Sequence, residues 1–153
     1  MTIRIVSLEA MRALGARLAD VAQPGDVIAL SGDLGAGKST LARAIVDALG
    51  FSGEVPSPTF ALILPYDPPD VRIPVIHADF YRLDGAADLD ELGLDAGDAA
   101  LLIAEWPERV GGLAGRDTLE LQIAGSDASE RAISAHAGQN WQARWQQIAG
   151  EWS

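Results

Sequence analysis

The stretch SGDLGAGKST, residues 31–40, decides the fold of this chain. It fits the spacing G-x-x-x-x-G-K-[S/T] through four residues, Gly32, Gly37, Lys38 and Ser39. Lys38 is the only lysine among 153 residues. A pattern of this kind has a definite chemical meaning only where a strand precedes it and a helix follows it.

Each residue type in the stretch suits the binding of phosphate. Glycines let a loop turn so that successive backbone N–H groups point inward and form a concave anion site. A helix that starts at the loop directs the positive end of its dipole to the same point. The side chain of Lys38 brings a full charge to the outer phosphates, and the hydroxyl of Ser39 is a ligand for Mg²⁺. The sequence therefore predicts a nucleotide site that uses its one lysine.

The flanking segments predict an α/β fold. Ser7 is placed to cap an amphipathic helix that ends at Pro24-Gly25, and the helix that starts after the loop ends at Gly50. Buried strands are predicted at residues 26–30, just before the loop, and at 71–78 and 99–104. Pro74 weakens the second of these strands.

The C-terminal third changes its period. Apolar residues alternate over 119–123, a turn is predicted at 125–129, and 132–135 continues as a second strand, which together indicate a β-hairpin. One stripe of a C-terminal helix carries Trp141, Trp145, Ile148 and Trp152. We interpret this stripe as core packing. The acidic segment 88–98 is interpreted as a short helix or turn with a solvated face.

Length and charge limit the classes of function. Residues 1–153 suit one domain, and a net charge of −11 disfavours direct binding of nucleic acid and leaves a basic protein partner open. The chain has no cysteine, which excludes disulfides. Charges interrupt the N-terminal apolar residues, so we expect no signal peptide, no membrane span and a cytoplasmic protein.

Two carboxylates follow predicted strands, Asp79 and Glu105. Open α/β sheets place functional groups at the carboxyl ends of their strands, and phosphoryl transfer needs acids that hold Mg²⁺ or orient the attacking oxygen. Both acids are therefore candidates for the site. His77 lies two residues before Asp79 and is interpreted as a core histidine. No histidine or cysteine nearby has metal spacing, which disfavours zinc.

Four segments together resemble the bacterial TsaE family, also called YjeE: GDLGAGKST, SPTF at 57–60, HADFYRL at 77–83 and EWPE at 105–108. The resemblance covers roughly residues 5–135. It implies a single-domain α/β P-loop NTPase fold with a mixed, mostly parallel sheet. It also implies a cytoplasmic ATPase that uses ATP and Mg²⁺ for threonylcarbamoyladenosine formation at position 37 of tRNA. The implied partner is the TsaD–TsaB complex, with tRNA contacted only indirectly.

The resemblance assigns roles to individual positions. It implies that Asp79 is the Walker B acid, that Glu105 contacts Mg²⁺ or orients water, and that Thr59 is a switch-like residue near the γ-phosphate. The division of metal and water between Asp79 and Glu105 stays open. Trp106 is implied to pack near the nucleotide or the partner. The expected nucleotide ligands are Gly32, Asp33, Gly35, Ala36, Gly37, Lys38, Ser39 and Thr40, with Ser39 also on the metal.

Two other functions remain open from sequence. A non-hydrolysing nucleotide-binding adaptor would share the loop, although the two carboxylates argue against it. A small-molecule kinase would need an arginine-bearing lid to exclude water, and Arg109, Arg116 and Arg131 are scattered. No arginine lies in the loop or is aimed at it in any way that the sequence shows, so we expect slow hydrolysis without the partner.

Overall fold

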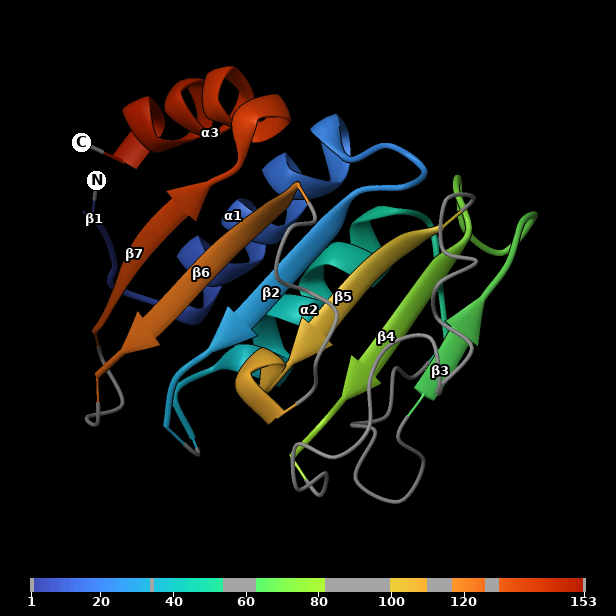
Figure 1. Ribbon diagram of the computed structural model, residues 1–153, viewed down its shortest axis with the longest axis horizontal. Helices are drawn as coiled ribbons and strands as arrows, with labels where there is room; N and C mark the ends of the chain where they lie inside the picture. Colours follow the sequence, from blue (N-terminus) through green and yellow to red (C-terminus); the bar gives the residue numbers. More distant parts are fainter. Residues whose placement is uncertain are drawn as a thin grey trace.

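The computed structural model describes residues 2–33, 35–53, 63–81, 100–109, 117–125 and 130–152. Within these ranges, seven strands form one sheet in the order β1-β7-β6-β2-β5-β4-β3, and two long helices, α1 and α2, lie side by side across one of its faces (Figure 1). The strands are β1 (Thr2–Ile5), β2 (Val27–Ser31), β3 (Ile63–Tyr66), β4 (Val75–Asp79), β5 (Leu101–Glu105), β6 (Thr118–Ala124) and β7 (Arg131–Ala137). The helices are α1 (Leu8–Val21), α2 (Lys38–Ala48) and α3 (Gln142–Ala149), with short 3₁₀ turns η2 (Pro107–Arg109), η3 (Gln139–Trp141) and η4 (Gly150–Trp152).

The sheet is mixed, and most of its strands run in the same direction. β2 pairs in parallel with both β5 and β6, and β4 pairs in parallel with β5. The pairs β3–β4, β6–β7 and β1–β7 are antiparallel. Strands β1, β2, β4, β5 and β6 therefore point one way, and β3 and β7 point the other. The predicted mixed, mostly parallel α/β sheet with a C-terminal hairpin is confirmed.

Helix α1 forms as its sequence predicts. The Ser7 side chain accepts a hydrogen bond from the backbone N–H of Ala10 at 3.0 Å and caps the helix. Met11, Leu14 and Leu18 then face the core at helical spacing. Any side chain at Gly15 would overlap Ala44 of α2, so the two helices approach closely where glycine stands.

The C-terminal helix is part of the core, as its tryptophan stripe predicts. Trp141 and Trp145 are buried in the main apolar cluster, and Trp152 packs against it. The guanidinium of Arg144 lies 3.8 Å from the centre of the Trp141 ring and donates to both carboxylate oxygens of Asp26, at 2.7 and 3.2 Å. Since Asp26 directly precedes β2, this ion pair ties α3 to the strand that leads into the glycine-rich loop.

One strand prediction needs correction, and two strands of the sheet were not predicted. The strand expected at 71–78 is only β4, Val75–Asp79, because Pro74 cannot donate to a ladder and the strand begins after it. The strands β1 and β3 were not predicted from the sequence. β1 has only four residues, and β3 contains Pro65, which the edge position of this strand tolerates. The expected segment 88–98 lies outside the described residues, as does most of the hairpin turn.

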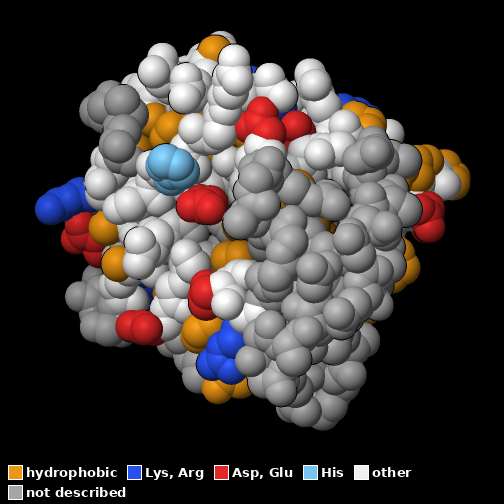
Figure 2. Space-filling model, in the orientation of Figure 1, with side chains coloured by type: hydrophobic (Ala, Val, Ile, Leu, Met, Phe, Trp, Pro, Cys, Tyr) orange, Lys and Arg blue, Asp and Glu red, His pale blue; other side chains and the backbone are white. Residues whose placement is uncertain are grey.

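The described surface shows no broad basic patch on the face seen in Figure 2, where acidic side chains are spread among neutral and apolar ones. This distribution fits the net charge of −11. No helix in the described ranges has the length and apolar character that a membrane crossing requires.

Candidate functional site

The loop between β2 and α2 has the backbone that its glycines predict. Gly32, Gly35 and Gly37 all have positive φ angles, of 142°, 82° and 112°. A side chain at Gly32 would also overlap the carbonyl oxygen of Ile123 on β6, so this position needs glycine for space as well as for conformation. Gly37 is the N-cap of α2 and offers no side-chain acceptor to the amides of the first turn. Because Gly37 supplies no such acceptor, the N–H groups of this first turn can meet an anion.

Lys38 begins α2 and is 5% exposed. Its Nζ donates to the carbonyl oxygens of Gly32 at 2.6 Å and Asp33 at 2.8 Å, and it lies 4.4 Å from the centre of the Trp106 ring. Burial lowers the pKa of Lys38, while neighbouring carboxylates, Glu105 first among them, act in the opposite direction. The side chain of Lys38 therefore reaches back from the start of α2 to the first residues of the loop.

Glu105 lies at the carboxyl end of β5 and is 2% exposed. Its Oε1 accepts a hydrogen bond from the Ser39 hydroxyl at 2.9 Å. Its Oε2 lies 2.6 Å from Nε2 of His77 on β4. Both oxygens of one buried carboxylate are thus engaged, one by the loop helix and the other by the neighbouring strand.

Asp79 ends β4 and stands in register with Glu105 across the parallel pair. It is half-buried, and its Oδ1 accepts a hydrogen bond from the backbone N–H of Tyr81 at 2.9 Å. Burial raises the pKa of Asp79 and the charge of Glu105 adds to the rise, while the hydrogen bond from the Tyr81 amide opposes it. The two predicted acids therefore meet at one sheet edge, with different surroundings.

Trp106 follows Glu105 and is the one non-glycine residue of the described ranges with a positive φ, 59°. Its ring contacts Tyr81, with the ring centres 4.9 Å apart, on the side of the site where Lys38 also lies. Arg109 lies near both rings and donates to the carbonyl oxygen of Tyr81 at 3.0 Å. The Trp106 ring therefore lies against the ammonium of Lys38 on one side of the site.

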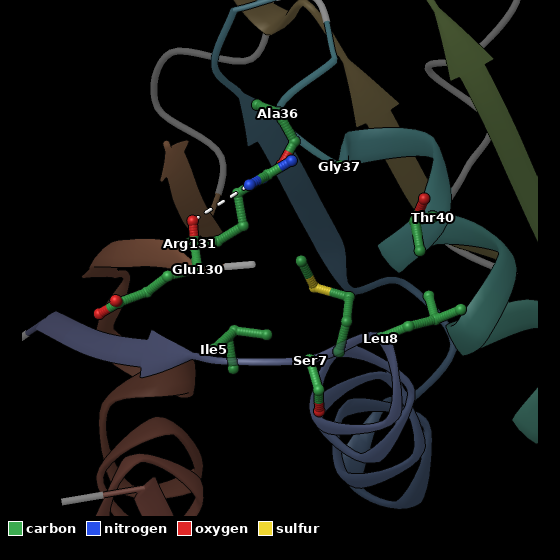
Figure 3. A pocket seen from close by; sticks show the side chains of 9 residues that line it. Ile5, Ser7, Leu8, Ala36, Gly37, Thr40, Glu130 and Arg131 are labelled. Carbon is green, nitrogen blue, oxygen red and sulfur yellow. Dashed lines mark hydrogen bonds between the residues drawn. The ribbon is translucent and has the colours of Figure 1, made fainter. Parts of the chain in front are cut away.

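The sequence did not predict Arg131 as part of the site. Arg131 begins β7, and its guanidinium donates to the carbonyl oxygens of Ala36 at 2.8 Å and Gly35 at 3.3 Å. It therefore contacts the loop from the hairpin side (Figure 3). The two bonds tie the carbonyl groups of this part of the loop to the start of β7. No local pattern could signal this contact, because 95 residues separate Arg131 from Ala36.

The structure brings most of the predicted site residues together. Lys38, Ser39, Asp79 and Glu105 converge where the loop meets the ends of β4 and β5, and Thr40 lies in the first turn of α2. Asp33 contributes its carbonyl to Lys38. Thr59 lies outside the described residues. His77 is buried, as a core histidine would be, but it also contacts a site acid, which the sequence did not predict.

A central parallel strand, a glycine-rich loop with its lysine and a helix that starts at the loop define a P-loop protein of the α/β class. The sequence profile of one family, Threonylcarbamoyl adenosine biosynthesis protein TsaE, matches residues 5–133. The chain belongs to the TsaE family.

Individual relatives agree with this assignment. The Bacillus subtilis protein named tRNA threonylcarbamoyladenosine biosynthesis protein TsaE is 35% identical over 134 residues, which are 86% of this chain and 82% of the relative. The Streptomyces coelicolor protein of the same name is 42% identical over 100 residues, 64% of this chain and 68% of the relative. A crystal structure of Bacillus subtilis YdiB superposes with a TM-score of 0.76 at 28% identity, and the match covers 99% of this chain and 95% of that one.

We predict that Arg131→Ala loosens the loop without unfolding the sheet. Loss of two hydrogen bonds from a charged donor should speed amide exchange in the loop peptide on the order of tenfold. Hydrogen–deuterium exchange followed by mass spectrometry measures this rate. Arg4→Ala is the matched control, because Arg4 is an exposed arginine whose ion pair is with the side chain of Glu130, whereas Arg131 bonds to loop carbonyls. Equal exchange in both variants would contradict the assigned contact.

Proposed function

We propose that this chain binds ATP with Mg²⁺ and hydrolyses it in support of threonylcarbamoyladenosine formation at position 37 of tRNA. Family membership supports the role in that biosynthesis. One observation supports the ATPase chemistry most strongly: the loop serine, Ser39, is hydrogen-bonded to the strand-end carboxylate Glu105, beside Lys38. A hydroxyl, a carboxylate and an ammonium around one loop are the groups that phosphoryl transfer uses.

The triphosphate is proposed to lie in the loop between β2 and α2. The ammonium of Lys38 now bonds to two carbonyl oxygens, and phosphate oxygens, which carry a full charge, would compete for it with advantage. The uncapped N-terminus of α2 offers further donors and the positive end of its dipole. Thr40, in the first turn of this helix, is proposed as a further phosphate ligand.

The base is proposed to occupy the hollow beside the loop that Figure 3 shows. Gly37 and Thr40 form its loop side, and Ile5, Leu8 and Met11 give it apolar walls. Apolar walls with a few polar groups are typical of sites for flat heterocycles. The hollow adjoins the loop directly, so one nucleotide could reach from it to Lys38.

The residues present fit Mg²⁺, a hard cation that prefers oxygen ligands. Ser39 and Glu105 would hold it, since their oxygens already lie 2.9 Å apart beside the loop. Bound there, Mg²⁺ would neutralise charge on the outer phosphates. Asp79 is assigned to orienting the attacking water, because it is half-buried and its carboxylate faces no loop hydroxyl in the described contacts.

The first prediction from this proposal tests the loop as the nucleotide site. Lys38→Ala should reduce ATP affinity at least about a hundredfold, because the cation that reaches the phosphates is removed. Isothermal titration with a non-hydrolysable ATP analogue measures the affinity. Arg17→Ala removes a cation from α1 that pairs with Asp20 and Glu151, so it is the control and should bind normally. Normal affinity of Lys38→Ala would exclude the loop.

The second prediction separates the two acids. Asp79→Asn and Glu105→Gln should each lower the rate constant of hydrolysis by about a hundredfold or more, because both act on the transferring group or its metal. Only Glu105→Gln should also remove the dependence of nucleotide affinity on Mg²⁺. Phosphate release and titrations with and without EDTA provide the two readouts. If the wild-type chain binds nucleotide but releases no phosphate, the non-hydrolysing adaptor is favoured instead.

The third prediction concerns the partner, which we propose to be the TsaD–TsaB complex. Arg131 and Arg109, the arginines described beside the loop and Trp106, both donate to backbone carbonyls. An additional cation from a partner would therefore complete the site, and such groups accelerate hydrolysis about 10³–10⁵-fold where they act.

The isolated chain should be a slow ATPase, and addition of TsaD–TsaB should accelerate phosphate release at least about tenfold. The complex should also form more tightly with a non-hydrolysable ATP analogue than with ADP, because a nucleotide can shift docking only through differential affinity. Partner gating would be contradicted if the chain alone hydrolyses ATP fast and binds TsaD–TsaB equally well with the ATP analogue and with ADP. That result would restore the kinase alternative.

A further inference from the structure

His77 is a fully buried polar side chain in an apolar layer of the sheet. Its neighbours in register are Ile103 on β5 and Leu64 on β3, both part of the apolar cluster or packed against it. Its Nε2 lies 2.6 Å from Glu105 Oε2, and its Nδ1 has no hydrogen-bond partner in the described ranges. Burial of an imidazole here costs free energy that an apolar residue would not cost.

The contact fixes the orientation of Glu105. An ionised carboxylate only accepts hydrogen bonds, so Nε2 is the donor and the imidazole tautomer is set by this contact. A glutamate side chain has three rotatable bonds, and a hydrogen bond to one oxygen removes most of that freedom. With Oε2 held by His77, Oε1 is the oxygen directed at the Ser39 hydroxyl.

We propose that His77 is a positioning residue that holds Glu105 ready for the metal at the loop. This inference rests on the proposed ATPase function. It gives His77, which the sequence analysis interpreted as a core histidine, a role in the site. Ser39 can exchange its hydrogen bond to Oε1 for a shared metal ion, while His77 keeps Oε2. Groups that orient metal ligands in this way typically change metal affinity or activity by about 10–100-fold when they are removed.

Two amide variants test the role with matched chemistry. The amide nitrogen of glutamine can reach the position of Nε2, whereas that of asparagine is too short to reach it. His77→Asn should therefore weaken the Mn²⁺ affinity of the chain with a non-hydrolysable ATP analogue by about 10–100-fold, and His77→Gln should recover most of it. Mn²⁺ titration followed by electron paramagnetic resonance measures this affinity without turnover.

Kinetics provide a second readout. His77→Asn should lower kcat, while nucleotide affinity in EDTA stays normal, because Lys38 and the loop are unchanged. Val75→Ala is the structural control, since Val75 is buried on the same face of β4, two residues away. This variant should keep wild-type Mn²⁺ affinity, even if it lowers thermal stability as much as His77→Asn does.

The outcomes separate this inference from the function on which it rests. Suppose that nucleotide affinity no longer depends on Mn²⁺ in Glu105→Gln, but that His77→Asn binds Mn²⁺ as tightly as the wild type. The positioning role is then wrong, and the ATPase proposal stands. The same conclusion follows if Val75→Ala loses as much Mn²⁺ affinity as His77→Asn. If nucleotide affinity of the wild type does not depend on Mn²⁺, the metal role of Glu105 fails and the role of His77 fails with it.

Discussion

The carboxylate of Glu105 is the interaction on which the rest of the site depends. It contacts Ser39 of α2 and His77 of β4 from its own place at the end of β5, so three elements meet at one buried charged group. A buried carboxylate is stable only when its oxygens are hydrogen-bonded. These hydrogen bonds link the start of the loop helix to the sheet, in addition to the apolar face that α2 buries in the core, and they direct the acid at the loop.

The glycine-rich loop is supported from both sides. Lys38 bonds to two of its carbonyls from the helix side, and Arg131 bonds to two others from the hairpin. The hairpin is held in turn by β1 at the sheet edge, and Arg144 ties the C-terminal helix to Asp26 at the start of β2. The C-terminal third of the chain thus supports the glycine-rich loop, because the sheet places β6 directly beside β2.

Local patterns were sufficient for those parts of the fold that local physics controls. The Ser7 cap, the apolar stripes of α1 and α2, and the alternation in β6 and β7 each depend on residues within a few positions of one another. Short or interrupted elements were missed. β1 offers too few residues for a period to show, and Pro65 hides an edge strand that only pairing with β4 makes visible.

By itself, the sequence determined the loop, its lysine and serine, and the two acids at strand ends, because spacing and residue type carry that chemistry. Tertiary structure alone decided which acid meets the serine, what holds that acid and what supports the loop. Glu105 is 66 residues from Ser39 and 28 from His77, and Arg131 is 95 residues from Ala36. No local pattern can encode such contacts, since they exist only where the order and register of the strands bring distant residues side by side.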